Sequence, residues 1–461
     1  MIRSRWLLLA GVLSASPARA QVPHLAGSLM LDPDAGRFDG ELCVSRFSPR
    51  APVRFLLATG LNVAQVTDSA GRVLDYKWYY DVDPSGEGTE YVVSLPDTAA
   101  RLSKLCVSYV GAFPVYDSNT ASDDWKGRIA FTAGTVRATE QTKWYPVLYD
   151  SASNHMEQAV TYRLQVRCPG CRTIYVNGAT PVRDTVADVT SAVARPLMLY
   201  VGRYDGHEMD GIDYLGGAVG PTTARVLRRT FNEIKEYYER LLDVAYGDRP
   251  TLLSFRSVAR ERYIGRNTWA FTTWPTIAFD GGLDFDQLID TTGRQSLYVL
   301  SHEMAHYYFG TVLVPHGPLY WLYLESTADY LSLKAIGRFA GDSAMRARVA
   351  DYLQQIQRTG SFPTLSAIRT EGEIDGTYRY RVGPLYLLAL DRMVGERKAA
   401  GLLRELLTAP AERPADYPSF RQAALAAGIT EAEFARFEAE CLTPPAATSC
   451  IATLASTQPR P

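Results

Sequence analysis

The pentapeptide His302-Glu303-Met304-Ala305-His306 constrains the fold of this chain more than any other feature, because it lies in an apolar run that predicts a helix over residues 293–309. Two histidines four residues apart on a helix differ by about 40° in direction and by one turn in height, so both imidazoles can reach one metal ion. The whole chain has only six histidines, so a chance match is improbable. The chain is therefore expected to fold around a metal-binding helix.

Zinc in a catalytic site keeps three protein ligands and one open position, so the two histidines need a third ligand. Glu325 follows His306 after eighteen residues, on a second predicted helix over residues 319–336. Its carboxylate can face back to complete a His302, His306, Glu325 set for one zinc ion per chain. Glu303 lies beside the ion, where it can take a proton from a water whose pKa the zinc has lowered.

The composition is that of a folded protein rather than a disordered or fibrous one. The 461 residues are 46% hydrophobic and 21% charged, with a formal net charge of −2. This length allows about three domains, each large enough to bury its own core. No long basic run is present, so nucleic acid and anionic membrane surfaces are not expected partners.

The first twenty residues predict a secretory signal peptide. Arg3 and Arg5 precede an apolar run over residues 6–13, and small residues at 16–20 provide a cleavage site. This run is too short to span a bilayer, and no other segment reaches about 18 uninterrupted apolar residues. The expected protein is exported, periplasmic or secreted, with no membrane anchor in the mature chain. The sequence does not fix its oligomeric state.

Six cysteines in an exported chain predict disulfides. The spacing favours the local pairs Cys168 with Cys171 and Cys441 with Cys450, which leaves Cys43 to pair with Cys106. The Cys168-Pro-Gly-Cys171 segment also has the form of a redox or zinc motif. No second pair and no nearby histidine completes a metal site there, so a structural disulfide is the preferred interpretation.

The chain changes character near residue 204, and we predict an α+β multidomain fold. Residues 21–203 alternate β-rich runs with turn signals, which predicts an N-terminal antiparallel β domain. Residues 204–345 are assigned to an α+β catalytic domain that begins with a helix after Pro221 and has strands at 252–255 and 269–279. Residues 346–461 are assigned to its helical C-terminal part.

The motif and its surroundings resemble the gluzincin metallopeptidases, and most closely the membrane alanine aminopeptidase family. The resemblance rests on H-E-x-x-H, eighteen residues, then E, and on the flanking patterns His-Glu-x-Ala-His-x-x-Phe-Gly at 302–310 and Trp-Leu-x-x-Glu-x-x-Ala-x-Tyr at 321–330. It implies a β domain followed by a thermolysin-like catalytic domain and C-terminal helices. A counterpart of the family's long C-terminal helical-repeat domain is not expected in these 461 residues.

The resemblance also implies two supporting residues. Asp329 lies one turn beyond Glu325, where thermolysin-like sites use a carboxylate to hold a zinc-bound imidazole; a solvated surface aspartate is the alternative. The family's oxyanion donor is a tyrosine in a Y-x-x-G motif, which matches Tyr380-Arg-Val-Gly383. Tyr380 is therefore the expected donor, with Tyr378 as the neighbour that could take its place.

The family's G-A-M-E-N motif, whose glutamate binds the free amine of the substrate, is absent. Alignment on Trp269 places Asn267 where that glutamate belongs, although the edge strand can still hold a peptide by strand addition. Glu140 and Gln141 resemble the remnant of a second amine contact. Trp269, with the alternating Phe271 and Trp274, could equally pack in the core or line a substrate pocket.

The sequence thus predicts a zinc-dependent metallopeptidase that is aminopeptidase-like and acts on peptides. An oligopeptidase or endopeptidase with no strict need for a free amine is a second interpretation. A metal-binding but inert peptide-recognition protein is a third, and the presence of Glu303 argues against it, because a binder needs no general base.

Overall fold

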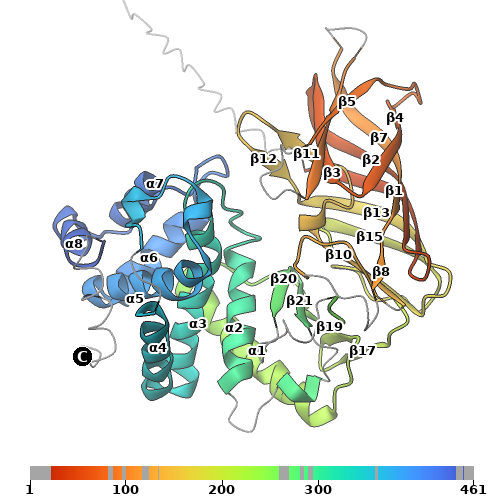
Figure 1. The fold of residues 1–461 in the computed structure, drawn as a ribbon. Helices are drawn as coiled ribbons and strands as arrows, with labels where there is room; N and C mark the ends of the chain where they lie inside the picture. Colours follow the sequence, from red (N-terminus) through yellow and green to blue (C-terminus); the bar gives the residue numbers. More distant parts are fainter. Residues whose placement is uncertain are drawn as a thin grey trace, which may run out of the picture.

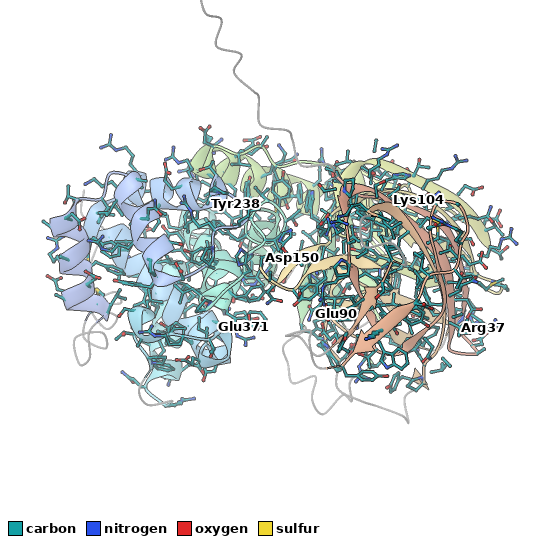
Figure 2. All side chains as sticks on the ribbon, turned by 90° about the horizontal axis from the view of Figure 1, so that it is seen from above. Arg37, Glu90, Lys104, Asp150, Tyr238 and Glu371 are labelled. Atoms are coloured by element: carbon teal, nitrogen blue, oxygen red, sulfur yellow. A yellow bond between two sulfur atoms is a disulfide. The ribbon has the colours of Figure 1, made fainter. Side chains whose placement is uncertain are left out.

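The computed structural model describes residues 22–80, 87–95, 100–116, 124–132, 134–258, 269–280, 285–288, 294–358, 362–442 and 450. These residues form a lobe of β-sheets and a largely helical lobe (Figure 1). Seen from above, the two lobes lie side by side, with Tyr238 and Glu371 in the helical lobe and Arg37, Glu90 and Lys104 in the β lobe (Figure 2). The predicted signal peptide, residues 1–20, lies outside the described residues.

The β lobe contains three mostly antiparallel sheets with one shared apolar core. The first has the order β15-β13-β1-β2-β7-β4, with bounds Val186–Arg195, Val160–Arg167, His24–Asp32, Arg37–Arg50, Leu102–Ala112 and Leu61–Thr67. The second has the order β14-β16-β10-β9-β8, with bounds Thr173–Val176, Leu199–Gly202, Thr135–Ala138, Ala130–Thr132 and Val115–Tyr116. The third has the order β12-β11-β3-β6-β5, with bounds His155–Glu157, Val147–Asp150, Val53–Ala58, Gly88–Val93 and Tyr76–Tyr79. Buried and exposed positions alternate along much of β2 and β13, as expected for strands with one face on the core.

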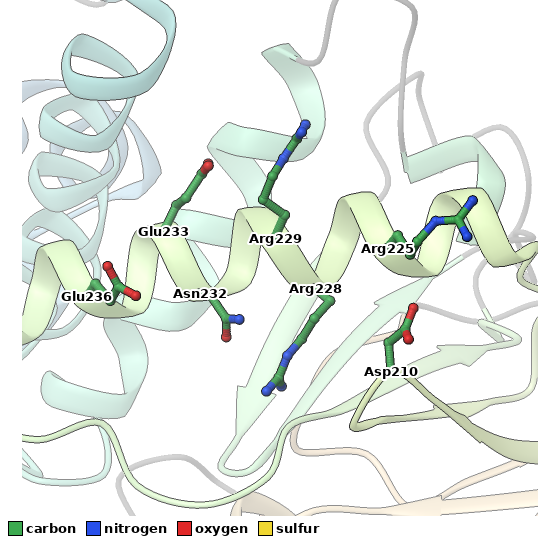
Figure 3. A pocket seen from close by; sticks show the side chains of 7 residues that line it. All are labelled: Asp210, Arg225, Arg228, Arg229, Asn232, Glu233 and Glu236. Atoms are coloured by element: carbon green, nitrogen blue, oxygen red, sulfur yellow. The ribbon is translucent and has the colours of Figure 1, made fainter.

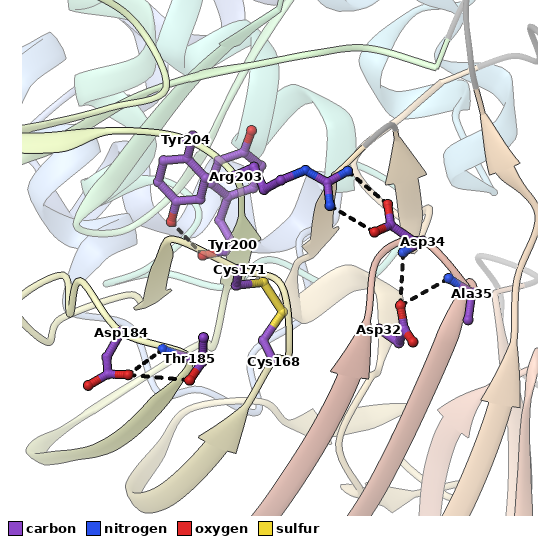
Figure 4. The surroundings of a disulfide bond; sticks show 10 residues. All are labelled: Asp32, Asp34, Ala35, Cys168, Cys171, Asp184, Thr185, Tyr200, Arg203 and Tyr204. Carbon is purple, nitrogen blue, oxygen red and sulfur yellow. Dashed lines mark hydrogen bonds and ion pairs between the residues drawn. A yellow bond between two sulfur atoms is a disulfide. The ribbon is translucent and has the colours of Figure 1, made fainter.

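All three predicted disulfides are confirmed: Cys43–Cys106, Cys168–Cys171 and Cys441–Cys450. Cys43 lies directly opposite Cys106 in the pairing of β2 with β7. Exposed ion pairs and hydrogen bonds surround Cys168–Cys171, such as the 2.8 Å contacts of Arg203 with Asp34 (Figure 4). None of the residues drawn there is a histidine. This environment agrees with a structural bond.

Removing the disulfides should destabilise the protein according to the loop that each one closes. Cys43 and Cys106 are separated by 63 residues, whereas Cys168 and Cys171 are separated by 3. Loop-closure entropy gives a loss of about 4 kcal/mol in the free energy of unfolding for a double alanine variant of the long-range pair, and about 2 kcal/mol for the short one. Urea denaturation of both double variants would measure these losses. A larger loss for the short pair would contradict the entropic origin.

The fourth sheet is formed by strands that follow the β lobe in the sequence, and it has the order β17-β18-β19-β21-β20. The bounds are Gly206–Met209, Ile212–Leu215, Thr251–Phe255, Thr276–Asp280 and Ala270–Thr273. The single strand predicted over residues 269–279 is wrong, because it is a hairpin that turns at Trp274-Pro275 between β20 and β21. Proline cannot donate to a strand ladder, so it favours such a break. β20 is an edge strand.

Helices pack around this sheet and form the second apolar core. Their bounds are α1 Pro221–Leu242, α2 Arg294–Tyr308, α3 Thr327–Ala340, α4 Asp342–Ile356, α5 Gly383–Val394, α6 Glu396–Leu407, α7 Tyr417–Ala426 and α8 Glu431–Phe437. The predicted helix over 319–336 differs in detail, since a π-helical turn at Leu322–Ser326 precedes α3. A second π-helical turn, Tyr378–Val382, precedes α5. In the described part of the chain, no helix is both long and apolar enough to cross a membrane.

Candidate zinc site

The three predicted metal ligands converge from two helical segments. His302 and His306 project from one face of α2, and Glu325 projects from the π-helical turn that leads into α3. Their ligand atoms all lie within 4.8 Å of one another. The side chains are 10%, 11% and 14% exposed respectively, so the cluster is largely buried.

The spacing of these atoms fits zinc. The Nε2 atoms of the two histidines are 3.2 Å apart. Oε2 of Glu325 lies 3.3 Å from Nε2 of His302 and 3.5 Å from Nε2 of His306. A tetrahedral zinc with ligands at about 2.0–2.1 Å requires neighbouring donors about 3.3 Å apart. The three donors therefore form one face of such a tetrahedron and leave a fourth position free, so the site fits one zinc ion.

Each imidazole is oriented through its other nitrogen. Nδ1 of His302 lies 3.3 Å from Oδ1 of Asp329, and Nδ1 of His306 lies 3.2 Å from the carbonyl oxygen of Phe309. Such partners fix the tautomer that presents Nε2 to a metal. Burial alone would raise the pKa of the Glu325 carboxyl group. Electrostatic interactions and hydrogen bonds with His306 and His302 outweigh this effect and hold the pKa below its ordinary value, so the carboxylate is ionised.

Asp329 is fully buried and held by two tyrosines that sequence reasoning missed. Tyr298 donates a hydrogen bond to Oδ1 at 2.7 Å, and Tyr352 of α4 donates one to Oδ2 at 3.0 Å. Arg348 stacks over the Tyr298 ring, with its guanidinium carbon 3.7 Å from the centroid. Tyr298 precedes His302 by four residues on the same face of α2, and this spacing could have indicated that Tyr298 lies near the metal site. Tyr352 had no local signal.

This support should tighten zinc binding. Tyr352→Phe removes one hydroxyl from Asp329, and loss of such an outer contact costs about tenfold in metal affinity. We expect chelator competition to give a zinc dissociation constant about tenfold higher. Tyr330→Phe is the matched control, because its hydroxyl binds Asp391 at 3.0 Å instead. Equal zinc affinity in the Tyr352 variant and the parent would contradict this role.

Glu303 lies on α2 between the two histidines but outside the ligand set. It is buried, and its Oε2 accepts a hydrogen bond of 2.9 Å from Oγ1 of Thr272, which also bonds the Glu303 carbonyl. Thr272 belongs to the edge strand β20, so this strand holds the carboxylate in place. Sequence reasoning missed Thr272, because nothing local links a strand threonine to a residue thirty-one positions later.

Tyr380 and Tyr378, the two candidate oxyanion donors, have different surroundings. The Tyr380 ring lies 6.2 Å from that of His302, whereas Tyr378 is fully buried against Phe362 and Tyr386 and its hydroxyl has no hydrogen-bond partner among the described residues. The charge of Glu325, followed by burial, raises the pKa of Tyr380 well above its ordinary value, so its hydroxyl stays protonated.

The turn that carries Tyr380 is fixed to the turn that carries Glu325. Ser326 Oγ donates a hydrogen bond of 2.7 Å to the carbonyl of Arg379. Gly383 allows the close approach, because a Cβ there would lie 2.1 Å from that Oγ. Close packing against Ser326 thus explains why the last position of the Y-x-x-G pattern is glycine.

The remaining predicted residues fall into three groups. Asn267 lies outside the described residues. Trp269 packs on Phe255 and Phe271, with ring centroids 5.1 and 5.4 Å away. Glu140 contacts β20 through a 2.6 Å hydrogen bond from Thr273, and Gln141 donates one of 2.9 Å to Glu87.

A separate surface pocket of about 520 Å³ lies on the outer face of α1 (Figure 3). Arg225, Arg228 and Arg229 face it together with three acidic residues: Asp210, Glu233 and Glu236. The formal charges of these six side chains sum to zero. It contains none of the metal-site residues.

Comparison with known proteins supports the fold. No protein-family model and no curated protein matches the sequence. An M1 zinc metallopeptidase from Deinococcus radiodurans superimposes with a TM-score of 0.65 at 17% identity, covering 96% of this chain and 97% of that one. The same enzyme bound to a Tyr-Ser-Ala substrate gives 0.62 at 18% identity, covering 93% and 96%. Yeast LTA4 hydrolase gives 0.62 at 13% identity, covering 97% of this chain and 72% of its own. The chain therefore has the predicted fold, shared with M1 zinc metallopeptidases.

Proposed function

We propose that this chain is a zinc-dependent peptidase of the aminopeptidase-like type, with one zinc per chain. The observation that carries the proposal is the set of three donors spaced for tetrahedral zinc, with Glu303 beside it but uninvolved in the ligand set. The fold shared with M1 zinc metallopeptidases supports it. A protein that only binds peptides would have no use for a buried carboxylate held beside a metal position.

The bound zinc supplies a Lewis acid that polarises a carbonyl oxygen and lowers the pKa of a water molecule. Glu303 accepts a proton from the attacking water and can deliver it to the leaving amine, while Thr272 keeps its carboxylate oriented. Tyr380, protonated and on the same side as His302, donates a hydrogen bond to the oxyanion that forms as the carbonyl is attacked. Asp329 keeps His302 aligned.

The substrate in this proposal is a peptide, and the tripeptide Tyr-Ser-Ala is a suitable first probe, because it is the ligand of a structural neighbour. We also propose that the protein is exported. The predicted signal peptide and the three disulfides support this, since disulfides persist in oxidising compartments.

Zinc content and activity should be lost together. We expect about one zinc per chain in the purified protein and hydrolysis of Tyr-Ser-Ala that a chelator stops and added zinc restores. His306→Ala removes one of three ligands and should lose both zinc and hydrolysis. Elemental analysis and mass spectrometry of the peptide would measure these quantities. A fully active, zinc-free protein would refute the proposal.

A further inference from the structure

The outer edge of β20 is where an added peptide strand would pair. In the pairing of β20 with β21, Phe271 lies opposite Ala278 and Thr272 opposite Ile277. The hydrogen bond from Asp280 N to Trp269 O, at 3.0 Å, fixes which positions face β21. Pairs alternate in an antiparallel ladder, so the carbonyl of Thr272 points away from β21, toward the free edge.

Lys126, from the β lobe, occupies this edge. Its Nζ donates a hydrogen bond of 2.6 Å to the carbonyl oxygen of Thr272 and forms an ion pair of 2.5 Å with Oε1 of Glu140. The other oxygen of Glu140 accepts a hydrogen bond of 2.6 Å from Thr273. Both carboxylate oxygens of Glu140 are therefore engaged. The Lys126 ammonium group therefore lies between the Glu140 carboxylate and the carbonyl of Thr272 on the edge strand.

The ion pair of Lys126 with Glu140 lies beside the zinc site. Thr272, whose carbonyl binds Lys126, holds Glu303 through its hydroxyl. The α-ammonium of a peptide bound along β20 would meet the same carboxylate and carbonyl.

We propose that Lys126 determines specificity: its ammonium fills the position at Glu140 and β20 where the free amine of a substrate would bind, so the enzyme does not select for free N-termini. This inference rests on the proposed peptidase function and favours cleavage of blocked and longer peptides. Stability alone is a weak reason for the pair, because its side chains are only 25% and 12% exposed and the cost of removing two charges from water offsets much of their attraction.

The test compares Tyr-Ser-Ala with its N-acetylated form in the full-length protein and in Lys126→Met, which keeps the length of the side chain without its charge. In the parent, acetylation should lower kcat/KM by less than about tenfold, because Glu140 is already neutralised. In Lys126→Met the freed carboxylate should bind the substrate amine, and the preference for the free peptide should rise at least about tenfold. Lys126→Arg retains the charge and should resemble the parent.

Lys235→Met is the matched control, because it removes a lysine from a comparable ion pair with Glu239, 2.7 Å long, on α1. Its preference should equal that of the parent. An unchanged preference in Lys126→Met, or an equal loss for both peptides, would overturn the proposal. A parent that already prefers the free peptide by more than about a hundredfold would overturn it without any variant.

Binding separates this inference from the proposed function. Dissociation constants of both peptides are measured by calorimetry in the zinc-loaded Glu303→Gln background, with and without Lys126→Met, so no turnover is needed. A preference for the free peptide that appears only with Lys126→Met supports the inference even if the parent hydrolyses neither peptide. An unchanged preference rejects it even if hydrolysis is rapid.

Discussion

Glu303→Gln is expected to keep its zinc and lose at least about a thousandfold in kcat on Tyr-Ser-Ala. Glutamine has nearly the same shape and can still accept the hydrogen bond from Thr272, but it cannot take a proton from water. The three ligands are untouched, so the metal should remain. Elemental analysis and steady-state kinetics on the same preparation would measure both quantities.

Thr272→Val provides the graded control for this variant. It removes the 2.9 Å hydrogen bonds to Glu303 while preserving the branched shape of the side chain. The carboxylate is still present, so kcat should fall by less than in Glu303→Gln, with zinc content unchanged. Activity in Glu303→Gln equal to that of the parent would show that another group accepts the proton.

The clustering of the three candidate zinc ligands could be predicted from the sequence because helical geometry determines most of their arrangement. His302 and His306 share a face of α2 through local spacing alone, and Glu325 needed only a second helix packed against the first. Asp329 follows from the same logic, one turn after Glu325. The π-helical turns were not predictable, because their apolar pattern is that of an ordinary helix.

The groups that hold these residues come from distant parts of the chain. Thr272 reaches Glu303 from a strand, Tyr352 reaches Asp329 from another helix, and Lys126 reaches the β20 edge from the other lobe. Each contact depends on tertiary packing that no periodicity encodes. Glu140 was predicted as an amine contact from resemblance, and only the structure revealed its partner Lys126.

Tyr380→Phe is expected to lower kcat about a hundredfold or more without loss of zinc, because a donor to the oxyanion typically contributes about 2.7–4 kcal/mol. Tyr380 lies beside His302, and its raised pKa keeps the hydroxyl protonated and able to donate. It is not a metal ligand, so metal content should be unaffected. Single-turnover kinetics would assign the loss to the chemical step rather than to product release.

Tyr378→Phe is the matched control, two residues away in the same π-helical turn. In the part of the chain that the structure describes, its buried hydroxyl has no hydrogen-bond partner, so its removal leaves no other group unsatisfied, and activity should remain near that of the parent. The two variants lose the same atom from the same turn, and they differ in whether the ring that carries it lies beside His302 or in the apolar core. A crippled Tyr378→Phe beside an active Tyr380→Phe would move the oxyanion donor to Tyr378 and require the turn to rotate when a substrate binds.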